Sequence, residues 1–137
     1  MKGLIYLILC PNVMSKRVLI FDDDNDILQV CSIVLKSKGL VVLTDNSCDK
    51  LVEQIQSFTP HVILMDNQIP SIGGIKATRL IKETEEIKNI PVIFFSANTE
   101  IARLSEQAGS EYFLQKPFDI DELESLVLKA IGEGDSV

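Results

Sequence analysis

Short apolar runs alternate with helix-like patterns along most of this chain. The apolar runs are residues 18–21, 40–44, 62–65, 92–95 and 111–115. Between consecutive runs, apolar residues recur at spacings of three and four, which is the period of one helix face. Strict alternation of strands with helices favours a parallel sheet that is covered by helices on both faces. The pattern therefore predicts an α/β fold of five strand–helix units, and it leaves the strand order open.

Single positions within the helical patterns give more specific expectations. The inward-facing residues are expected to include Val30 in the first helix, Leu80 in the third and Ile120 in the last. Ser47 is a plausible N-cap of the second helix, because its hydroxyl can accept a hydrogen bond from an unpaired amide. Gly39 is expected to end the first helix as a C-cap glycine would.

The run of residues 62–65 is followed directly by a carboxylate, Asp66. The run is short, rich in branched residues and flanked by Pro60 and Pro70, which favours a buried strand over a helix. Open parallel sheets place their ligand sites at the carboxyl ends of the strands. Asp66 is therefore expected at the ligand-binding edge of a central strand.

Composition and charge narrow the range of functions. With 137 residues the chain has the size of one domain, and its formal net charge is −7. This charge argues against nucleic acid or an anionic membrane as the main partner. The cysteines, Cys10, Cys31 and Cys48, show no disulfide or metal-binding spacing, which favours a reducing, cytoplasmic location. Cys31 is expected to be a small core residue.

Side chains of complementary chemistry lie at the ends of four predicted strands. Asp22–Asp24 follow the first strand, Asp66 the third, Ser96 the fourth and Lys116 the fifth. Because parallel strands end at one edge of the sheet, these groups are expected to lie together. Carboxylate pairs about 4 Å apart repel by about 4 kcal/mol at an effective dielectric of 20, so the cluster is expected either to recruit a cation or to keep some carboxylates protonated. Mg²⁺, an ammonium and a hydroxyl can hold the oxygens of a phosphoryl group, with Asp66 as its nucleophile.

Four segments of the chain look like the signature segments of response-regulator receiver domains. They are Leu19–Asp24, Asp66–Gly74, Phe95–Ala97 and Lys116–Phe118. The resemblance runs from about Lys16 to Ile131, and the chain is similar to the single-domain chemotaxis and sporulation relay regulators. It implies a flavodoxin-like (βα)5 three-layer sandwich with sheet order 2-1-3-4-5. It also implies a phosphorylation-dependent signalling switch of a two-component or phosphorelay system.

The resemblance further implies a phosphoryl-accepting site that needs a metal ion. Asp66 would accept the phosphoryl group from a sensor histidine kinase or a histidine phosphotransfer protein. The metal ion, Mg²⁺ or Mn²⁺, would be held by Asp22, Asp23, Asp66 and the backbone carbonyl of Gln68. The side chains of Gln68 and Asn98 occupy positions that tune the lifetime of the aspartyl phosphate.

The remaining family positions concern the switch. Ser96 matches the switch hydroxyl, and Lys116 matches the lysine that contacts the phosphoryl group. Phe113 matches the aromatic switch position, whose inward turn would alter the face of helix four, strand five and helix five for a downstream protein partner. Plain core packing of Phe113 is the alternative. The Lys116–Pro117 peptide bond is expected to be cis.

Two other functions are compatible with the sequence. A haloacid-dehalogenase-like phosphatase also combines a strand-end Asp nucleophile with a second Asp, a hydroxyl, a Lys and Mg²⁺; here the nucleophile would be Asp22. That assignment leaves Asp66 without a role. The other alternative is a receiver-shaped binding module that is never phosphorylated. In the favoured interpretation the chain is not an enzyme beyond the chemistry of its own phosphorylation and dephosphorylation.

The expected domain organisation is one receiver domain at residues 14–131. Residues 1–13 are expected to be an extension outside the fold, and residues 132–137 a short polar tail. The apolar stretch Leu4–Leu9 is far shorter than the ~20 residues that span a bilayer. The chain is expected to act as a monomer or weak dimer without nucleic-acid or membrane partners, and to bind a protein or relay the phosphoryl group.

Overall fold

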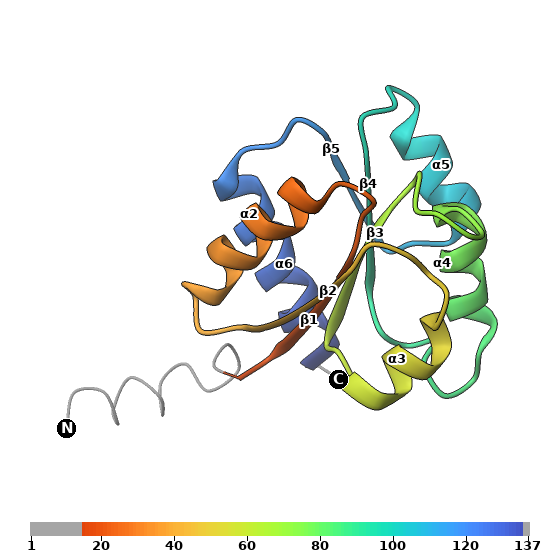
Figure 1. The fold of residues 1–137 in the computed structure, drawn as a ribbon, viewed down its shortest axis with the longest axis horizontal. Helices are drawn as coiled ribbons and strands as arrows, with labels where there is room; N and C mark the ends of the chain where they lie inside the picture. Colours follow the sequence, from red (N-terminus) through yellow and green to blue (C-terminus); the bar gives the residue numbers. More distant parts are fainter. Residues whose placement is uncertain (1–14, 136–137) are drawn as a thin grey trace.

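The structure, a computed structural model, describes residues 15–135, which form five strands and five helices (Figure 1). The strands are β1 (Arg17–Phe21), β2 (Val41–Asp45), β3 (Val62–Asp66), β4 (Val92–Ser96) and β5 (Tyr112–Gln115). The helices are α2 (Asn25–Lys36), α3 (Leu51–Phe58), α4 (Gly74–Glu83), α5 (Ile101–Ala108) and α6 (Ile120–Asp135). The strands are parallel, in the order β2-β1-β3-β4-β5, which confirms the expected flavodoxin-like fold.

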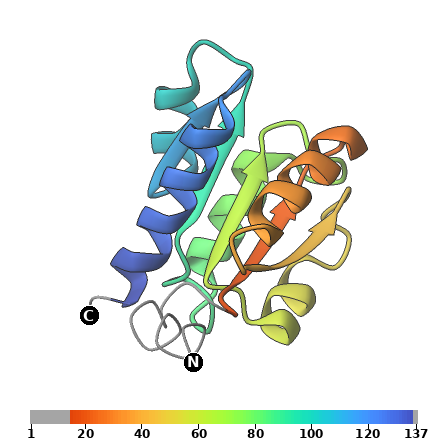
Figure 2. The same ribbon diagram turned by 90° about the vertical axis from the view of Figure 1, so that its left-hand side faces the viewer.

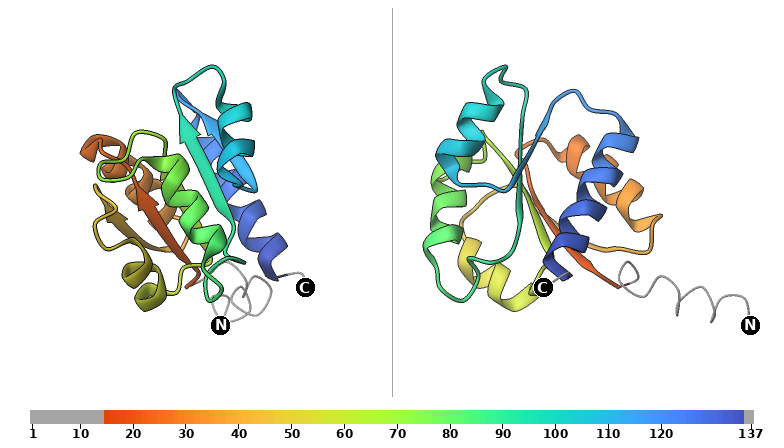
Figure 3. Two further views of the ribbon diagram at one scale, coloured as in Figure 1. Left: turned by 90° about the vertical axis from the view of Figure 1, so that its right-hand side faces the viewer. Right: turned by 180° about the vertical axis from the view of Figure 1, so that it is seen from behind.

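Helices cover both faces of the sheet. Helices α2 and α6 lie on one face (Figure 2), and α3, α4 and α5 lie on the other (Figure 3). Along β1, Val18 and Ile20 pack with α2 and α6, whereas Leu19 and Phe21 pack with α3 and α4. All four side chains are fully buried, and each such burial contributes about 1.5–3 kcal/mol. Alternate residues of one strand thus hold the two helical layers together.

Strand β3 lies in the middle of the sheet. Every residue of β3 is buried. It pairs with β1 along one edge and with β4 along the other. At its carboxyl end Asp66 is in register with Phe95 of β4. A carboxylate therefore ends a strand that is enclosed on both faces and both edges.

Three apolar residues that were expected to face inward are exposed instead. They are Val30, Leu80 and Ile120, with exposed fractions of 52%, 41% and 52%. In α2 the buried residues are Leu28, Cys31 and Leu35, so Cys31 is the core residue that was expected. The expectation was wrong at Val30 because an apolar spacing cannot by itself fix which side of a helix meets the sheet.

Two expected helix ends are also wrong. Ser47 does not cap α3, which begins after Lys50, and Lys50 makes no side-chain hydrogen bond as its N-cap. Helix α2 ends at Lys36, so Gly39 lies beyond it, in the turn before β2, with φ of +87°. Gly109, by contrast, closes α5 in the left-handed conformation. Glycine marks where the chain can turn, and the helix can end before that point.

The receiver domain was expected to span residues 14–131. Residues 1–13, which were predicted to lie outside the fold, are not among the described residues. Helix α6 continues to Asp135, and it therefore enters the stretch that was expected to be a polar tail. Within residues 15–135, no helix has both the length and the apolar character needed to cross a membrane.

Helix α4 begins in direct contact with the backbone of β3. The amide of Gly74 donates a hydrogen bond to the carbonyl of Asn67 at 2.9 Å. A Cβ atom on Gly74 would lie 2.2 Å from the carbonyl oxygen of Asp66 and 2.7 Å from Cα of Asn67. Only glycine therefore allows α4 to start this close to the end of β3.

Replacing Gly74 with alanine is expected to destabilise the protein by about 2–3 kcal/mol, because the backbone of Asp66 would have to move. The matched control is Gly132→Ala in α6, where a Cβ would have nothing within 4 Å. That change is expected to be neutral or to stabilise by up to about 1 kcal/mol. Urea unfolding of both variants measures the difference, and equal stabilities would contradict the close contact.

Candidate functional site

A hollow of about 490 Å³ opens at the carboxyl edge of the sheet. Its walls are residues at or just after the ends of β1, β3, β4 and β5, together with Ile27 of α2. Seven residues singled out from the sequence line it: Asp22, Asp23, Asp66, Gln68, Ser96, Asn98 and Lys116. The topology thus gathers side chains from distant parts of the chain into one site.

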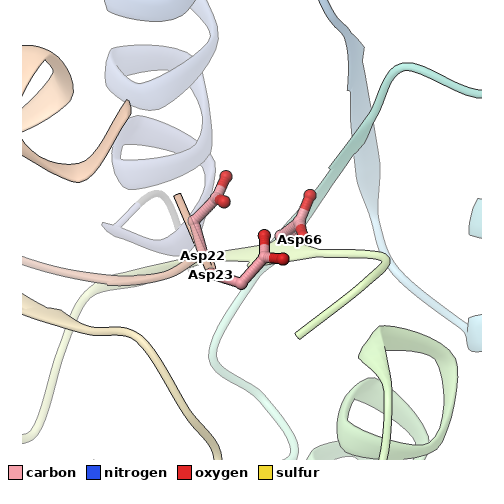
Figure 4. Close-up of side chains that lie close together, drawn as sticks. All are labelled: Asp22, Asp23 and Asp66. Atoms are coloured by element: carbon pink, nitrogen blue, oxygen red, sulfur yellow. The ribbon is translucent and has the colours of Figure 1, made fainter. Parts of the chain in front are cut away.

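Three carboxylates meet in this hollow (Figure 4). Asp22 and Asp23 follow β1, and Asp66 ends β3; one carboxylate oxygen from each lies within 4.8 Å of the others. Asp22 and Asp66 are buried, whereas Asp23 is exposed. The site is therefore a concentrated negative charge with one side open to solvent.

Lys116 places its ammonium between the two buried carboxylates. Its Nζ atom donates hydrogen bonds to Oδ2 of Asp22 at 2.7 Å and to Oδ1 of Asp66 at 2.9 Å. The same ammonium lies 4.6 Å from the centre of the Phe95 ring. The backbone amide of Lys116 donates to the carbonyl of Ser96 at 2.8 Å, which fixes the end of β5 beside β4. The Lys116–Pro117 peptide bond is cis.

Burial dominates the titration of Asp22. Loss of water around this carboxyl raises its pKa from 3.8 to about 6, although Lys116 and the amide of Asp24 favour the ionised form. Burial alone would lower the pKa of Lys116, but its hydrogen bonds to Asp22 and Asp66 outweigh that effect and raise it. The lysine therefore stays charged, and Asp22 is the carboxyl that resists ionisation.

Backbone amides orient the polar side chains at three strand ends. The amide of Asp24 donates to Oδ1 of Asp22 at 2.8 Å, and the amide of Gln68 donates to Oδ2 of Asp66 at 3.0 Å. In the same way the amide of Asn98 donates to Oγ of Ser96 at 3.1 Å. In each case the donor lies two residues after the side chain. The carboxylates and the hydroxyl are thereby held in fixed orientations.

The donor set fits a hard divalent cation. Asp22, Asp23 and Asp66 together carry more negative charge than the single ammonium of Lys116 balances, and carboxylate oxygens are the ligands that Mg²⁺ prefers. Gln68 lines the same hollow. The role of its backbone carbonyl as a further ligand stays a prediction.

Asp24 lines the hollow as well, whereas Phe113 does not. The carboxylate of Asp24 caps α2 by accepting hydrogen bonds from the amides of Asp26 and Ile27, as an N-cap does. Phe113 lies on β5 outside the hollow and is 46% exposed, which excludes plain core packing as its role.

One contact near the site was not anticipated. The hydroxyl of Ser71, in the connection between β3 and α4, donates a hydrogen bond to Oδ1 of Asp49, in the connection between β2 and α3. Both side chains are exposed polar groups far apart in the sequence. No periodicity or motif signals such a pair, so only the folded chain reveals it.

In metal-free protein, the ionisation of Asp22 is expected to lower stability as the pH rises. The folded-state pKa of about 6 exceeds the unfolded value of 3.8, so the folded state gains less than the unfolded one from losing this proton. Between about pH 4.5 and pH 7.5, wild type should lose about 2 kcal/mol relative to Asp22→Asn. Urea unfolding in the presence of a chelator measures this difference.

The control for this prediction is Glu85→Gln, which neutralises a carboxylate with an 81% exposed side chain. Its stability should follow that of wild type within about 0.5 kcal/mol at both pH values. If the stabilities of wild type and Asp22→Asn changed with pH in the same way, this would show that burial does not raise the pKa of Asp22.

Known proteins similar to this chain include sensor kinases and response regulators. The CAI-1 autoinducer sensor kinase/phosphatase CqsS of Vibrio cholerae is 33% identical over 112 residues, which make up 80% of this chain and 16% of CqsS. The polar-differentiation response regulator DivK of Brucella ovis is 25% identical over 88% of this chain and 99% of DivK. The chain therefore spans a small part of one relative and nearly all of the other.

A solved receiver-domain structure is similar to this chain in fold. The receiver domain of the sensor histidine kinase PA1611 from Pseudomonas aeruginosa has a TM-score of 0.79 and 28% identity, covering 86% of this chain and 98% of that domain. That structure holds a magnesium ion coordinated in its active-site cleft. The model of the response regulator receiver domain family matches residues 18–128 of this chain. The protein belongs to the response regulator receiver domain family.

Proposed function

We propose that this chain is a phosphorylation-dependent switch that accepts a phosphoryl group on Asp66 from a phosphohistidine. The donor would be a sensor histidine kinase or a histidine phosphotransfer protein, in keeping with the sensor kinase and the response regulator among its relatives. The observation that carries the proposal is the position of Asp66. Its carboxylate ends the central strand and faces Lys116, Asp22 and Asp23 within one hollow.

The transfer forms a bond between an Asp66 oxygen and phosphorus, and it breaks the bond from phosphorus to the donor imidazole nitrogen. The amide of Gln68 holds Oδ2 of Asp66, so the carboxylate cannot rotate freely as the donor approaches. Lys116 lies within hydrogen-bond distance of Asp66 and can donate to a phosphoryl oxygen there. Ser96, on the neighbouring strand end, supplies a hydroxyl for a second phosphoryl oxygen.

Asp22, Asp23, Asp66 and the carbonyl of Gln68 would hold Mg²⁺, or Mn²⁺ in its place. When bound, the ion offsets the negative charge of carboxylates and phosphoryl oxygens, as metal ions do in phosphoryl transfer. The side chains of Gln68 and Asn98 line the hollow and would set how readily water reaches the aspartyl phosphate. We infer no turnover of a separate substrate, since the phosphatase alternative gives Asp66 no role.

The output would follow from a change at Phe113. This side chain is 46% exposed on β5, between α5 and α6 along the chain. In the phosphorylated state Ser96 would turn toward the phosphoryl group, which leaves room for Phe113 to turn inward. The face formed by α5, β5 and α6 would then bind a downstream protein or take part in phosphoryl relay.

We further propose that residues 14–131 act as one receiver unit in the cytoplasm, as a monomer or weak dimer. The family match at residues 18–128 falls within that span. The formal net charge of −7 disfavours nucleic acid as a direct partner.

Incubation with acetyl phosphate and Mg²⁺ is expected to add one acid-labile phosphoryl group to wild type and none to Asp66→Asn. Peptide mass spectrometry should place the modification on Asp66. The reaction should stop when a chelator removes the metal, because the clustered carboxylates repel a phosphate donor. A modification that persists in Asp66→Asn would contradict the assignment. Label on Asp22 with turnover of phosphate esters would instead support the phosphatase.

Phosphorylation is also expected to bury Phe113. Fluorinated phenylalanine can be incorporated at the six Phe positions, and Phe113→Leu identifies the Phe113 resonance. On phosphorylation this ¹⁹F resonance should shift and lose solvent exposure in wild type. In Ser96→Ala the shift should be absent even where Asp66 is phosphorylated. An unchanged resonance in phosphorylated wild type would show that Phe113 is not part of the switch.

A further inference from the structure

The connection between β3 and α4, residues 67–73, is held against the connection between β2 and α3. Ile69 is 2% exposed and packs in one core cluster with Cys48, in the connection between β2 and α3, and with Leu51, the first residue of α3. Above this apolar contact, the hydroxyl of Ser71 donates a hydrogen bond to Oδ1 of Asp49 at 2.5 Å. The two connections are therefore joined by a buried apolar contact and by one hydrogen bond at the surface, the Ser71–Asp49 clasp.

Ser71 has a backbone conformation that its own residue type does not favour. Its φ is +89°, in the region where side chains other than glycine are uncommon. A conformation of this kind persists where surrounding contacts hold it in place. The hydrogen bond to Asp49 is charge-assisted, which makes it stronger than a bond between neutral groups. It is thus suited to hold Ser71 in this conformation.

The clasp lies close to groups that the site uses. Gln68, three positions before Ser71, donates its amide to Oδ2 of Asp66. At the other end of the connection, Gly74 donates its amide to Asn67. Gln68 therefore belongs to a connection that is held both by the buried Ile69 and by the Ser71–Asp49 hydrogen bond.

We propose that Ser71 and Asp49 are positioning residues for the divalent cation. Their hydrogen bond holds residues 67–73 so that the carbonyl of Gln68 faces Asp22 and Asp66. This inference rests on the proposed function, which makes that carbonyl a ligand. Asp49 itself is not a ligand; it acts through Ser71. Breaking the bond lets the connection move and weakens binding of the ion without unfolding the domain.

The competing explanation is that Asp49 attracts the cation only through its charge. Glu53 offers a matched control, because Asp49 and Glu53 line the same surface hollow beside α3. In the part of the chain that the structure describes, no polar contact joins Glu53 to residues 67–73. Glu53→Ala therefore removes the same charge from the same region and leaves the clasp intact.

The test is Mg²⁺ binding measured by calorimetry, without any phosphodonor, for Ser71→Gly, Asp49→Ala, the double variant and Glu53→Ala. Ser71→Gly removes the hydroxyl and relaxes the backbone at a positive φ, so the fold is preserved. Groups that orient a metal ligand change affinity by about 10–100-fold. We expect each clasp variant to raise the Kd about 10-fold, the double variant to add little, and Glu53→Ala to change it less than about 2-fold.

Hydrogen exchange gives an independent readout. In Ser71→Gly and Asp49→Ala, the amides of Gln68, Ile69, Ser71 and Ile72 should exchange faster than in wild type, while those of β3 stay protected. A wild-type Kd in Ser71→Gly, or equal increases in Asp49→Ala and Glu53→Ala, would overturn the positioning role. If wild type bound no Mg²⁺ at all, the proposed metal site would be wrong, and the positioning role would be wrong with it. If wild type and Ser71→Gly bound Mg²⁺ equally well, the positioning role alone would be wrong.

Discussion

The ammonium of Lys116, between Asp22 and Asp66, is the contact on which the arrangement of the site depends. It forms hydrogen bonds with Asp22 and Asp66, which lie 94 and 50 positions before it in the sequence. Burial takes water away from the carboxyl of Asp22, and the nearby charge of Asp66 adds a smaller repulsion, which is why Asp22 has a pKa of about 6. The charge of Lys116 offsets part of this cost, and its ammonium holds the two carboxylates on either side of it.

The parallel sheet brings the residues of this contact to the same edge. Strands β1, β3, β4 and β5 end at one edge of the sheet, and a polar side chain lies at or just after the end of each. Gly74 lets α4 begin against the backbone of Asp66, and amides two residues on orient Asp22, Asp66 and Ser96. The core fixes the strands, the strands fix the backbone at their ends, and that backbone orients the polar side chains of the hollow.

Much of this could be predicted from the sequence, because strand ends are marked by the change from apolar residues to Asp22, Asp66, Ser96 and Lys116. The exposure of Val30 could not, since the apolar spacing of α2 suits more than one rotation of the helix. The Ser71–Asp49 hydrogen bond could not be predicted for a different reason. It joins two exposed polar residues on separate connections, and the residues beside them in the sequence form no recognisable pattern. Contacts between connections depend on how the whole chain packs, whereas the end of a strand can be recognised from the local sequence.

The most direct test of the central claim is a crystal structure of the protein with Mg²⁺ and beryllofluoride, an analogue of a phosphoryl group. We expect beryllium on a carboxylate oxygen of Asp66, the fluorides within hydrogen-bond distance of Lys116 Nζ and Ser96 Oγ, and Mg²⁺ beside Asp22 and Asp23. Beryllofluoride on Asp22, or a Lys116 ammonium that stays between the two carboxylates without touching the analogue, would contradict the claim that these residues form one phosphoryl-accepting site.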